Sequence, residues 1–343
     1  MVIQNIPTNI ITGFLGVGKT TAILHLLKSK PKTERWAVLV NEFGEIGVDG
    51  AIFKTALGDQ RGIFIKEVPG GCMCSAAGLP MQIALTMLLA KSKPDRLLIE
   101  PTGLGHPKEV LSTLHGSAFK EALDVQRTIT LVDARKLEDP RYLKNEIFQQ
   151  QLDIADVVAA NKIDLYSGME HLKLSSYLEE RFPRHDKKVV QVTNGELSID
   201  WLVGQPRFLP EQTNHHESEE HKNASPHTAN KAIEEDGKSP FPKTGFVSRK
   251  NQGDGFFSQG WIFKPGIVFC KTKLHILLSG ADVERIKAVF ITDLGVFSYN
   301  RTDKILRETS VDETTDSRIE VITANEADLE LFEVELLRCQ QQS

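Results

Sequence analysis

The stretch of sequence that decides the fold is Gly13-Phe14-Leu15-Gly16-Val17-Gly18-Lys19-Thr20, which follows the apolar run Asn9–Thr12. It has the pattern G-x-x-x-x-G-K-[ST] of a phosphate-binding loop (P-loop), whose glycines let backbone N–H groups point at phosphate oxygens. In such a loop Lys19 reaches the β- and γ-phosphates, and the Thr20 hydroxyl binds Mg²⁺. A helix that begins near Lys19 would direct the positive end of its dipole at the same anion.

The composition is that of an ordinary globular chain. The length of 343 residues suggests two domains, and 40% of the residues are hydrophobic and 25% are charged. The net charge of −5 gives no basic surface for nucleic acid or an anionic membrane. No apolar run approaches the ~20 residues of a membrane span, and the N-terminus lacks the pattern of a secretion signal. We therefore expect a cytoplasmic protein with no nucleic-acid or membrane partner.

Residues 1–204 alternate between short β-rich runs and helical patterns such as Leu79–Lys91 and Leu172–Arg181. This alternation predicts an α/β P-loop domain with a mostly parallel sheet, in which ligands bind at the carboxyl ends of the strands. The expected strands are Asn9–Thr12, Trp36–Val40, Ile63–Val68, Arg96–Glu100, Thr128–Val132, Val157–Ala160 and Val189–Val192.

Residues 205–245 form a polar stretch that we expect to be a mobile linker, and residues 246–343 form a small α+β domain. The linker contains His215, His216 and His221, which could meet on one metal ion; a plain solvated linker is the alternative. In the second domain the expected strands are Gly260–Phe263, Gly266–Phe269, Arg285–Ile291, Val296–Asn300 and Ser317–Ile322, and the expected helices start at Lys273 and span Glu326–Arg338.

The tetrapeptide Asn161-Lys162-Ile163-Asp164 follows a late apolar strand and has the N-K-x-D pattern that selects guanine. The Asp164 carboxylate would accept hydrogen bonds from the N1–H and the exocyclic amine of guanine, donors that adenine lacks as a pair. Lys162 would lie along the base. The alternative is a polar turn without a ligand.

A strand-end acid follows in Leu97–Gly103, where Glu100 is placed to hold Mg²⁺ together with Thr20. Gly103 would offer its N–H to the γ-phosphate. The alternative is that Glu100 caps the next helix.

The loop Asn41–Gly50 is rich in acidic residues and glycine and follows the second strand. Glu42, Glu45 and Asp49 could contact Mg²⁺, a catalytic water or a second metal. A solvated acidic loop is the alternative.

A pair of thiols, Cys72 and Cys74, stands beside Gly70-Gly71. Two thiolates at this spacing can bind Zn²⁺ or Cu(I), but they do not complete a tetrahedral site. Glu45, His106, water or a client protein would supply the other ligands. Buried, inert cysteines are the alternative.

Taken in order, these motifs resemble those of the CobW-like metallochaperone GTPases. The resemblance rests on Thr12–Thr21, Asn41–Glu45, Gly71–Cys74, Glu100–Gly103 and Asn161–Asp164, and it extends to Arg285–Val289 and Ser317–Ile322 in the second domain. It implies a slow GTPase that binds GTP, GDP and Mg²⁺, binds Zn²⁺ or a related ion, and delivers that ion to client metalloproteins. It also implies metal-dependent association of two copies.

Carried onto this chain, the resemblance assigns nucleotide binding to Gly13–Thr20, Thr21, Gly103, Asn161, Lys162 and Asp164. It assigns the zinc site to Cys72 and Cys74 in a C-x-C-C motif whose third cysteine is Ser75 here. Either the site binds the ion more weakly, or another ligand substitutes, or Ser75 is an engineered replacement.

The cysteine pair lies in sequence between two loops expected at the γ-phosphate, so GTP could draw the metal ligands together and hydrolysis could release them. No arginine or glutamine stands out as an in-cis catalyst, so we expect turnover well below ~1 s⁻¹. A regulatory GTPase without metal transfer and a GTP-dependent cofactor- or cobalt-insertion factor remain as alternatives.

Overall fold

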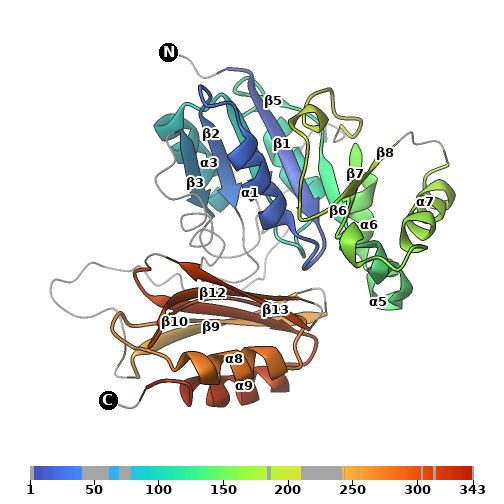
Figure 1. Cartoon of the computed structure of the whole chain (residues 1–343). Coiled ribbons are helices and arrows are strands. Elements are labelled where there is room, and N and C mark those ends of the chain that lie inside the picture. Colours follow the sequence, from blue (N-terminus) through green and yellow to red (C-terminus); the bar gives the residue numbers. More distant parts are fainter. Residues whose placement is uncertain are drawn as a thin grey trace, which may run out of the picture.

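The computed structural model describes residues 4–40, 62–68, 79–183, 187–209, 242, 244–253, 255–302, 304–311 and 314–341. Figure 1 shows two layered parts, an α/β part above and an antiparallel sheet with two helices below it. Among the described residues, no helix is both long and apolar enough to cross a lipid bilayer.

The α/β part is built on a parallel sheet with the strand order β3-β2-β4-β1-β6-β7-β8, and β5 pairs with the start of β1. This confirms the predicted α/β P-loop fold class. The strands are β1 (Ile6–Gly13), β2 (Trp36–Val40), β3 (Ile63–Glu67), β4 (Arg96–Glu100), β5 (Leu123–Val125), β6 (Ile129–Val132), β7 (Val157–Asn161) and β8 (Lys188–Val192).

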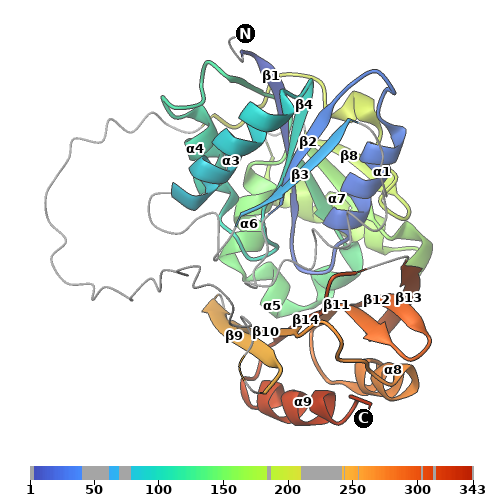
Figure 2. The same ribbon diagram turned by 90° about the vertical axis from the view of Figure 1, so that its left-hand side faces the viewer.

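Helices cover both faces of this sheet because its strands are apolar on both sides. On β1, Ile11 packs in one core with α1 (Lys19–Ser29), α6 (Glu146–Asp153) and α7 (Glu170–Arg181). Its neighbour Ile10 packs in the opposite core with α3 (Leu79–Ser92) and α4 (Pro107–His115). Figure 2 shows α3 and α4 on one side of the sheet and α1 on the other. The short α5 (Pro140–Leu143) precedes α6.

The C-terminal part is a six-stranded antiparallel sheet with the order β13-β12-β11-β14-β10-β9. Helices α8 (Lys271–Gly280) and α9 (Ala327–Leu337) enclose a core that includes Trp261 and Phe290. The strands are β9 (Phe246–Gly253), β10 (Phe256–Phe263), β11 (Arg285–Thr292), β12 (Gly295–Thr302), β13 (Ile305–Val311) and β14 (Ser317–Thr323).

The expected strand Gly266–Phe269 is wrong. Gly266 has φ +95°, and Ile267 N donates to Lys264 O at 3.2 Å, so the chain turns there. Phe269 makes only isolated bridges, to Thr292 and Gln340. The sequence reading also missed β5, β9 and β13. The latter two are edge strands whose sequences are largely polar.

The open face of the C-terminal sheet packs on the α/β part at the carboxyl ends of the parallel strands (Figure 1). Ile322 of β14 belongs to the same core as Val17 of the P-loop, and the ring of Phe256 lies 6.4 Å from that of Phe14. Phe208, which belongs to the expected linker, packs on the core beside α4. The domain limits 1–204, 205–245 and 246–343 stay predictions.

Candidate nucleotide-binding site

The loop Gly13–Thr20 forms a tight turn between β1 and α1, and α1 begins at Lys19 as expected. Gly13 and Gly18 have φ values of +141° and +98°, which side chains disfavour. A Cβ at Gly13 would lie 2.4 Å from Leu131 O, and one at Gly18 would lie 2.6 Å from Asn161 Nδ2. The loop therefore requires glycine at both positions.

The ammonium of Lys19 lies inside this loop, where it donates to Gly13 O at 2.9 Å and to Phe14 O at 3.2 Å. Burial, followed by the nearby charges of Arg285 and Lys287, lowers the pKa of Lys19 to about 7, although the carboxylate of Glu100 opposes this shift. The loop thus holds a buried cation that a phosphate group would stabilise.

Thr20 and Glu100 form the second part of the site. Thr20 Oγ1 donates to Glu100 Oε1 at 2.9 Å, and Glu100 is buried at the end of β4. Burial raises the pKa of Glu100, and nearby Lys19 partly offsets that rise. Glu100 Oε2 has no hydrogen-bond partner among the described residues. A hydroxyl and an unpartnered carboxylate oxygen are hard ligands of the kind that Mg²⁺ prefers.

Gly103 lies directly against the P-loop, since a Cβ there would approach Leu15 N to 3.0 Å. Gln151 Nε2 donates to Gly103 O at 3.0 Å and holds the turn in place. The backbone of Gly103 is thus beside the loop expected to bind phosphate.

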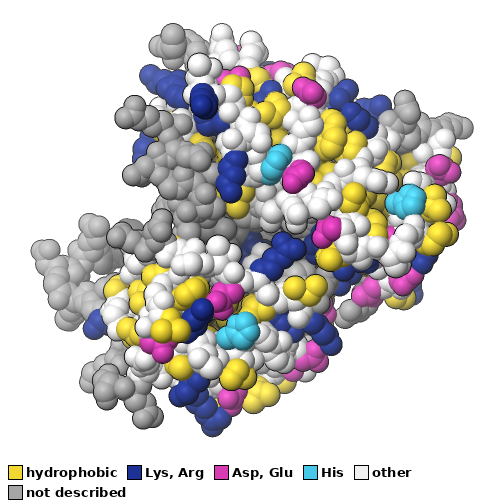
Figure 3. Space-filling view, viewed as in Figure 1, with side chains coloured by type: hydrophobic (Ala, Val, Ile, Leu, Met, Phe, Trp, Pro, Cys, Tyr) yellow, Lys and Arg dark blue, Asp and Glu magenta, His cyan; other side chains and the backbone are white. Residues whose placement is uncertain are grey.

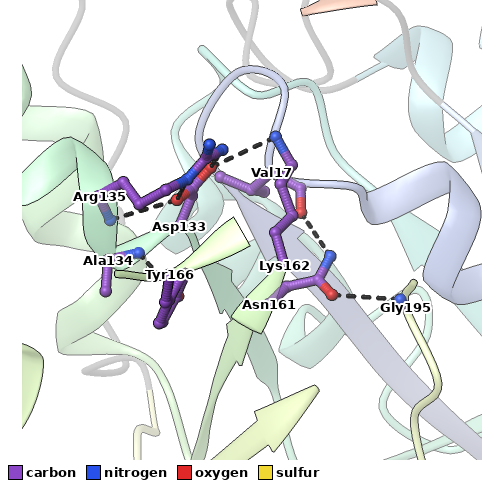
Figure 4. A network of polar contacts seen from close by, with 8 residues as sticks. All are labelled: Val17, Asp133, Ala134, Arg135, Asn161, Lys162, Tyr166 and Gly195. Atoms are coloured by element: carbon purple, nitrogen blue, oxygen red, sulfur yellow. Dashed lines mark hydrogen bonds and ion pairs between the residues drawn. The ribbon is translucent and has the colours of Figure 1, made fainter. Parts of the chain in front are cut away.

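The tetrapeptide Asn161–Asp164 begins at the end of β7 (Figure 4). Asn161 Nδ2 donates to Val17 O at 2.8 Å, and Asn161 Oδ1 accepts from Gly195 N at 3.1 Å, so this side chain braces the P-loop. Lys162 has φ 63° and its Nζ lies 3.3 Å from Asp133 Oδ2. Asp164 is exposed and its carboxylate accepts no hydrogen bond within the described part of the chain.

A cavity of about 80 Å³ joins these elements. Its α/β side includes Gly18, Thr21, Lys162 and Asp164. Its other side comes from β12 and β13 of the C-terminal sheet: Asn300, Thr302, Ile305 and Arg307.

Two residues at this site were missed by sequence reasoning: Arg285 and Lys287 of β11. Lys287 Nζ donates to Thr20 Oγ1 at 3.1 Å, and the side chain is buried. Their alternation with Ile286 and Ala288 indicates a strand with a polar face but not what that face contacts, and the family resemblance of Arg285–Val289 gave these two residues no role. In the space-filling view, Lys and Arg side chains lie in the hollow between the two parts (Figure 3).

Most of the expected metal-binding and switch residues lie outside the described residues: Glu42, Glu45, Asp49, Cys72, Cys74, Ser75, His215, His216 and His221. His106 is described. It is half-buried at the start of α4, with Nδ1 3.4 Å from Gln150 Oε1. The described part of the chain contains no group of three or more His, Cys, Asp or Glu side chains that could hold a metal ion.

The sequence is similar to known nucleotide-binding proteins. The family model described as CobW/HypB/UreG, nucleotide-binding domain, matches residues 7–191. The zinc chaperone YeiR of Escherichia coli is 39% identical over 337 residues, which are 96% of this chain and 97% of YeiR. The zinc chaperone CobW of Pseudomonas aeruginosa is 30% identical over 228 residues, 59% of this chain and 60% of CobW.

Among solved structures, the Zn(II)-bound YjiA GTPase from E. coli aligns over 98% of this chain and 99% of its own, with 21% identity and a TM-score of 0.43.

Proposed function

Because the chain belongs to the CobW/HypB/UreG family of nucleotide-binding proteins, we propose that it is a GTP-binding, slowly GTP-hydrolysing metallochaperone that carries Zn²⁺ to client metalloproteins. The observation that carries the nucleotide part is a convergence at the carboxyl ends of β1, β4 and β7. There the P-loop, the Thr20–Glu100 pair and Asn161 are joined by hydrogen bonds of 2.8–2.9 Å.

Three side chains would contact GTP directly, and a fourth, Asn161, would hold the loop that binds it. Lys19 binds the β- and γ-phosphates, Asp164 accepts hydrogen bonds from guanine, and Lys162 lies along the base. The exposure of Asp164 and its position beside Lys162 at one cavity support this assignment. Asn161 would support the site without contacting the base, because its amide nitrogen and oxygen both bond to the protein backbone.

Thr20 and Glu100 would hold Mg²⁺, which neutralises negative charge on the phosphates when it is bound. Glu100 Oε2 supports this role, because it is buried and has no hydrogen-bond partner in the described part of the chain. Glu42 and Asp49 remain candidate switch or catalytic residues, outside the described part.

The proposed binding of zinc rests on the two relatives described above, both of which are zinc chaperones, and on the Cys72 and Cys74 pair. We assign these thiolates to Zn²⁺, with Glu45 or His106 as a further ligand. A histidine-bearing segment with His215, His216 and His221 is a weaker, additional metal candidate. The ion is cargo, and its transfer to a client and metal-dependent pairing of two copies belong to the same proposal.

The proposal is tested by GTP hydrolysis measured with and without Zn²⁺ in wild type and in the double variant Cys72→Ser/Cys74→Ser. Wild type should hydrolyse GTP at well below ~1 s⁻¹ and respond to Zn²⁺, and the double variant should keep basal hydrolysis but lose the response. Cys270→Ser, which removes a free thiol in the C-terminal part, is the matched control and should behave like wild type. Absence of GTP hydrolysis in wild type would contradict the GTPase part of the proposal. A zinc response in the double variant that equals that of wild type would contradict the assignment of Zn²⁺ to Cys72 and Cys74.

A further inference from the structure

One face of the C-terminal sheet carries polar side chains to the P-loop. Strand β11 alternates, so Ile286 and Phe290 lie in the core that α8 and α9 help to enclose, and Lys287 lies on the opposite face. Glu320 of β14 and Asn300 of β12 stand directly opposite Lys287 in the sheet. The register therefore fixes a row of polar residues across this face.

The ammonium of Lys287 contacts the hydroxyl oxygen of Thr20, the atom that would bind Mg²⁺. Lys287 Nζ donates to Thr20 Oγ1 at 3.1 Å while the same hydroxyl donates to Glu100 Oε1 at 2.9 Å. In a P-loop this hydroxyl oxygen offers its lone pair to Mg²⁺. Lys287 is only 3% exposed, so an added Mg²⁺ on the same oxygen would have to displace this buried ammonium.

The sheet also contacts the P-loop through β12. A Cβ built at Gly16 would lie 2.3 Å from Thr302 Cγ2, so β12 touches the P-loop backbone. The cavity beside Lys162 and Asp164 has a volume of about 80 Å³. A larger cavity of about 470 Å³ lies between Leu15 and Gly16 of the P-loop and the C-terminal sheet. The space beside Lys162 and Asp164, where we expect the base, is therefore narrow while β12 and β13 lie there.

We propose that the C-terminal domain is an internal inhibitor of the nucleotide site, docked on the P-loop with the Lys287 ammonium in the position of Mg²⁺ at Thr20. This inference rests on the proposed GTP-binding function and names its regulation. Docking of the sheet and binding of Mg²⁺ at Thr20 compete for the same hydroxyl oxygen. Each therefore weakens the other by the same factor. A partner that draws the C-terminal domain away would load the protein with nucleotide.

The test compares Lys287→Met, which keeps the length of the side chain and removes its charge, with wild type. Equilibrium binding of a fluorescent GDP analogue is measured over a range of Mg²⁺ concentrations. Lys287→Met should bind more tightly by about 5- to 150-fold, the usual range of coupling between sites, and should need less Mg²⁺. Lys273→Met, at an exposed position on α8, is the matched control and should match wild type.

A second measurement uses wild type alone. Brief acetylation with acetic anhydride, read by mass spectrometry, should modify Lys287 slowly in the free protein and several-fold faster with Mg²⁺ and GDP, while exposed Lys273 reacts equally in both states. The inhibitory contact is overturned if Lys287→Met binds the nucleotide no more tightly than wild type does. It is also overturned if Lys287 is acetylated at the same rate with and without Mg²⁺ and GDP. Either result leaves the proposed GTP binding intact. If neither wild type nor Lys287→Met binds guanine nucleotides, the proposed function itself falls together with this inference.

Discussion

At the scale of single residues, Asp164 should decide which nucleotide is bound. Its carboxylate is exposed beside Lys162 and would accept two hydrogen bonds that only guanine donates. Hydrogen bonds to a charged group contribute about 1.5–3 kcal/mol, so Asp164→Ala should weaken GTP binding about 10- to 100-fold and leave ATP binding almost unchanged. Titration calorimetry with both nucleotides measures this. Glu179→Ala, at an exposed position on α7, should change neither, and a GTP affinity retained by Asp164→Ala would refute the assignment.

Glu170 gives a prediction about pH and stability. Its carboxylate accepts from Ser167 N, Ser167 Oγ and Gly168 N at 2.8–2.9 Å, and the bond from Ser167 N is the largest cause lowering its pKa to about 2. Because the folded-state pKa lies below the ordinary 4.5, this stabilisation is complete above pH ~4.5 and is lost as pH falls through ~2. Glu170→Gln should therefore lower the melting temperature at pH 7, and its difference from wild type should shrink below pH 4. A difference that is the same at every pH would contradict this.

The conformation of a residue could be predicted where the chemistry of a motif requires one residue type at a fixed spacing. Gly13, Gly18 and Lys19 occupy the conformations expected of a P-loop. Lys287 could not be predicted, because its contact with Thr20 joins positions 267 residues apart and depends on how two parts of the chain pack. The bracing role of Asn161 was likewise invisible, since it follows from hydrogen bonds to Val17 and Gly195.

At the scale of elements, the P-loop depends on its glycines for space as well as for backbone conformation. Gly18→Ala places a Cβ 2.6 Å from Asn161 Nδ2, which should break the brace to Val17 and abolish measurable nucleotide binding. The matched control is Gly168→Ala. Gly168 also has a positive φ (+126°), but nothing lies within 4 Å of its Cβ position. Both variants should lose about 1–3 kcal/mol of stability from backbone strain, and only Gly18→Ala should lose nucleotide binding. Equal nucleotide binding by the two variants would contradict the claim that a clash between the added Cβ and Asn161 disables the loop.

The core of the C-terminal sheet gives a second element-scale prediction. Phe290 is fully buried, and its ring lies 4.7 Å from that of Phe269. Phe290→Ala should lower the free energy of unfolding of this part by about 3–5 kcal/mol. Ile276→Ala, at a side chain that is 68% exposed on α8, should change it by less than about 0.5 kcal/mol. Urea unfolding followed by tryptophan fluorescence measures both, and similar losses would show that Phe290 is not a core residue.

Elements were predictable where burial sets the pattern. Strands β2 and β4 are apolar and have the predicted limits, Trp36–Val40 and Arg96–Glu100. Strands β9 and β13 were missed because edge strands pair on one side only and tolerate polar sequences. The segment Gly266–Phe269 has strand-like residues, but the turn at Pro265 and Gly266 prevents pairing.

At the scale of the whole molecule, the C-terminal sheet covers the carboxyl ends of the parallel strands (Figure 1), where we propose that the nucleotide binds. The sequence predicted two parts and a site on the first one, but not that the second would contact that site. Composition and periodicity describe each part alone, whereas Thr302 against Gly16 and Lys287 against Thr20 are contacts between them.

The central claim is that guanine nucleotide and zinc bind to one coupled system. Equilibrium Zn²⁺ binding, measured with and without a non-hydrolysable GTP analogue and Mg²⁺, tests it most directly, with Ser75→Cys as a companion that supplies a third thiolate. We predict that the analogue changes the Zn²⁺ affinity, that Zn²⁺ changes the affinity for the analogue by the same factor, and that Ser75→Cys binds the ion more tightly. Zn²⁺ affinity that is identical with and without the analogue in both proteins would contradict the claim.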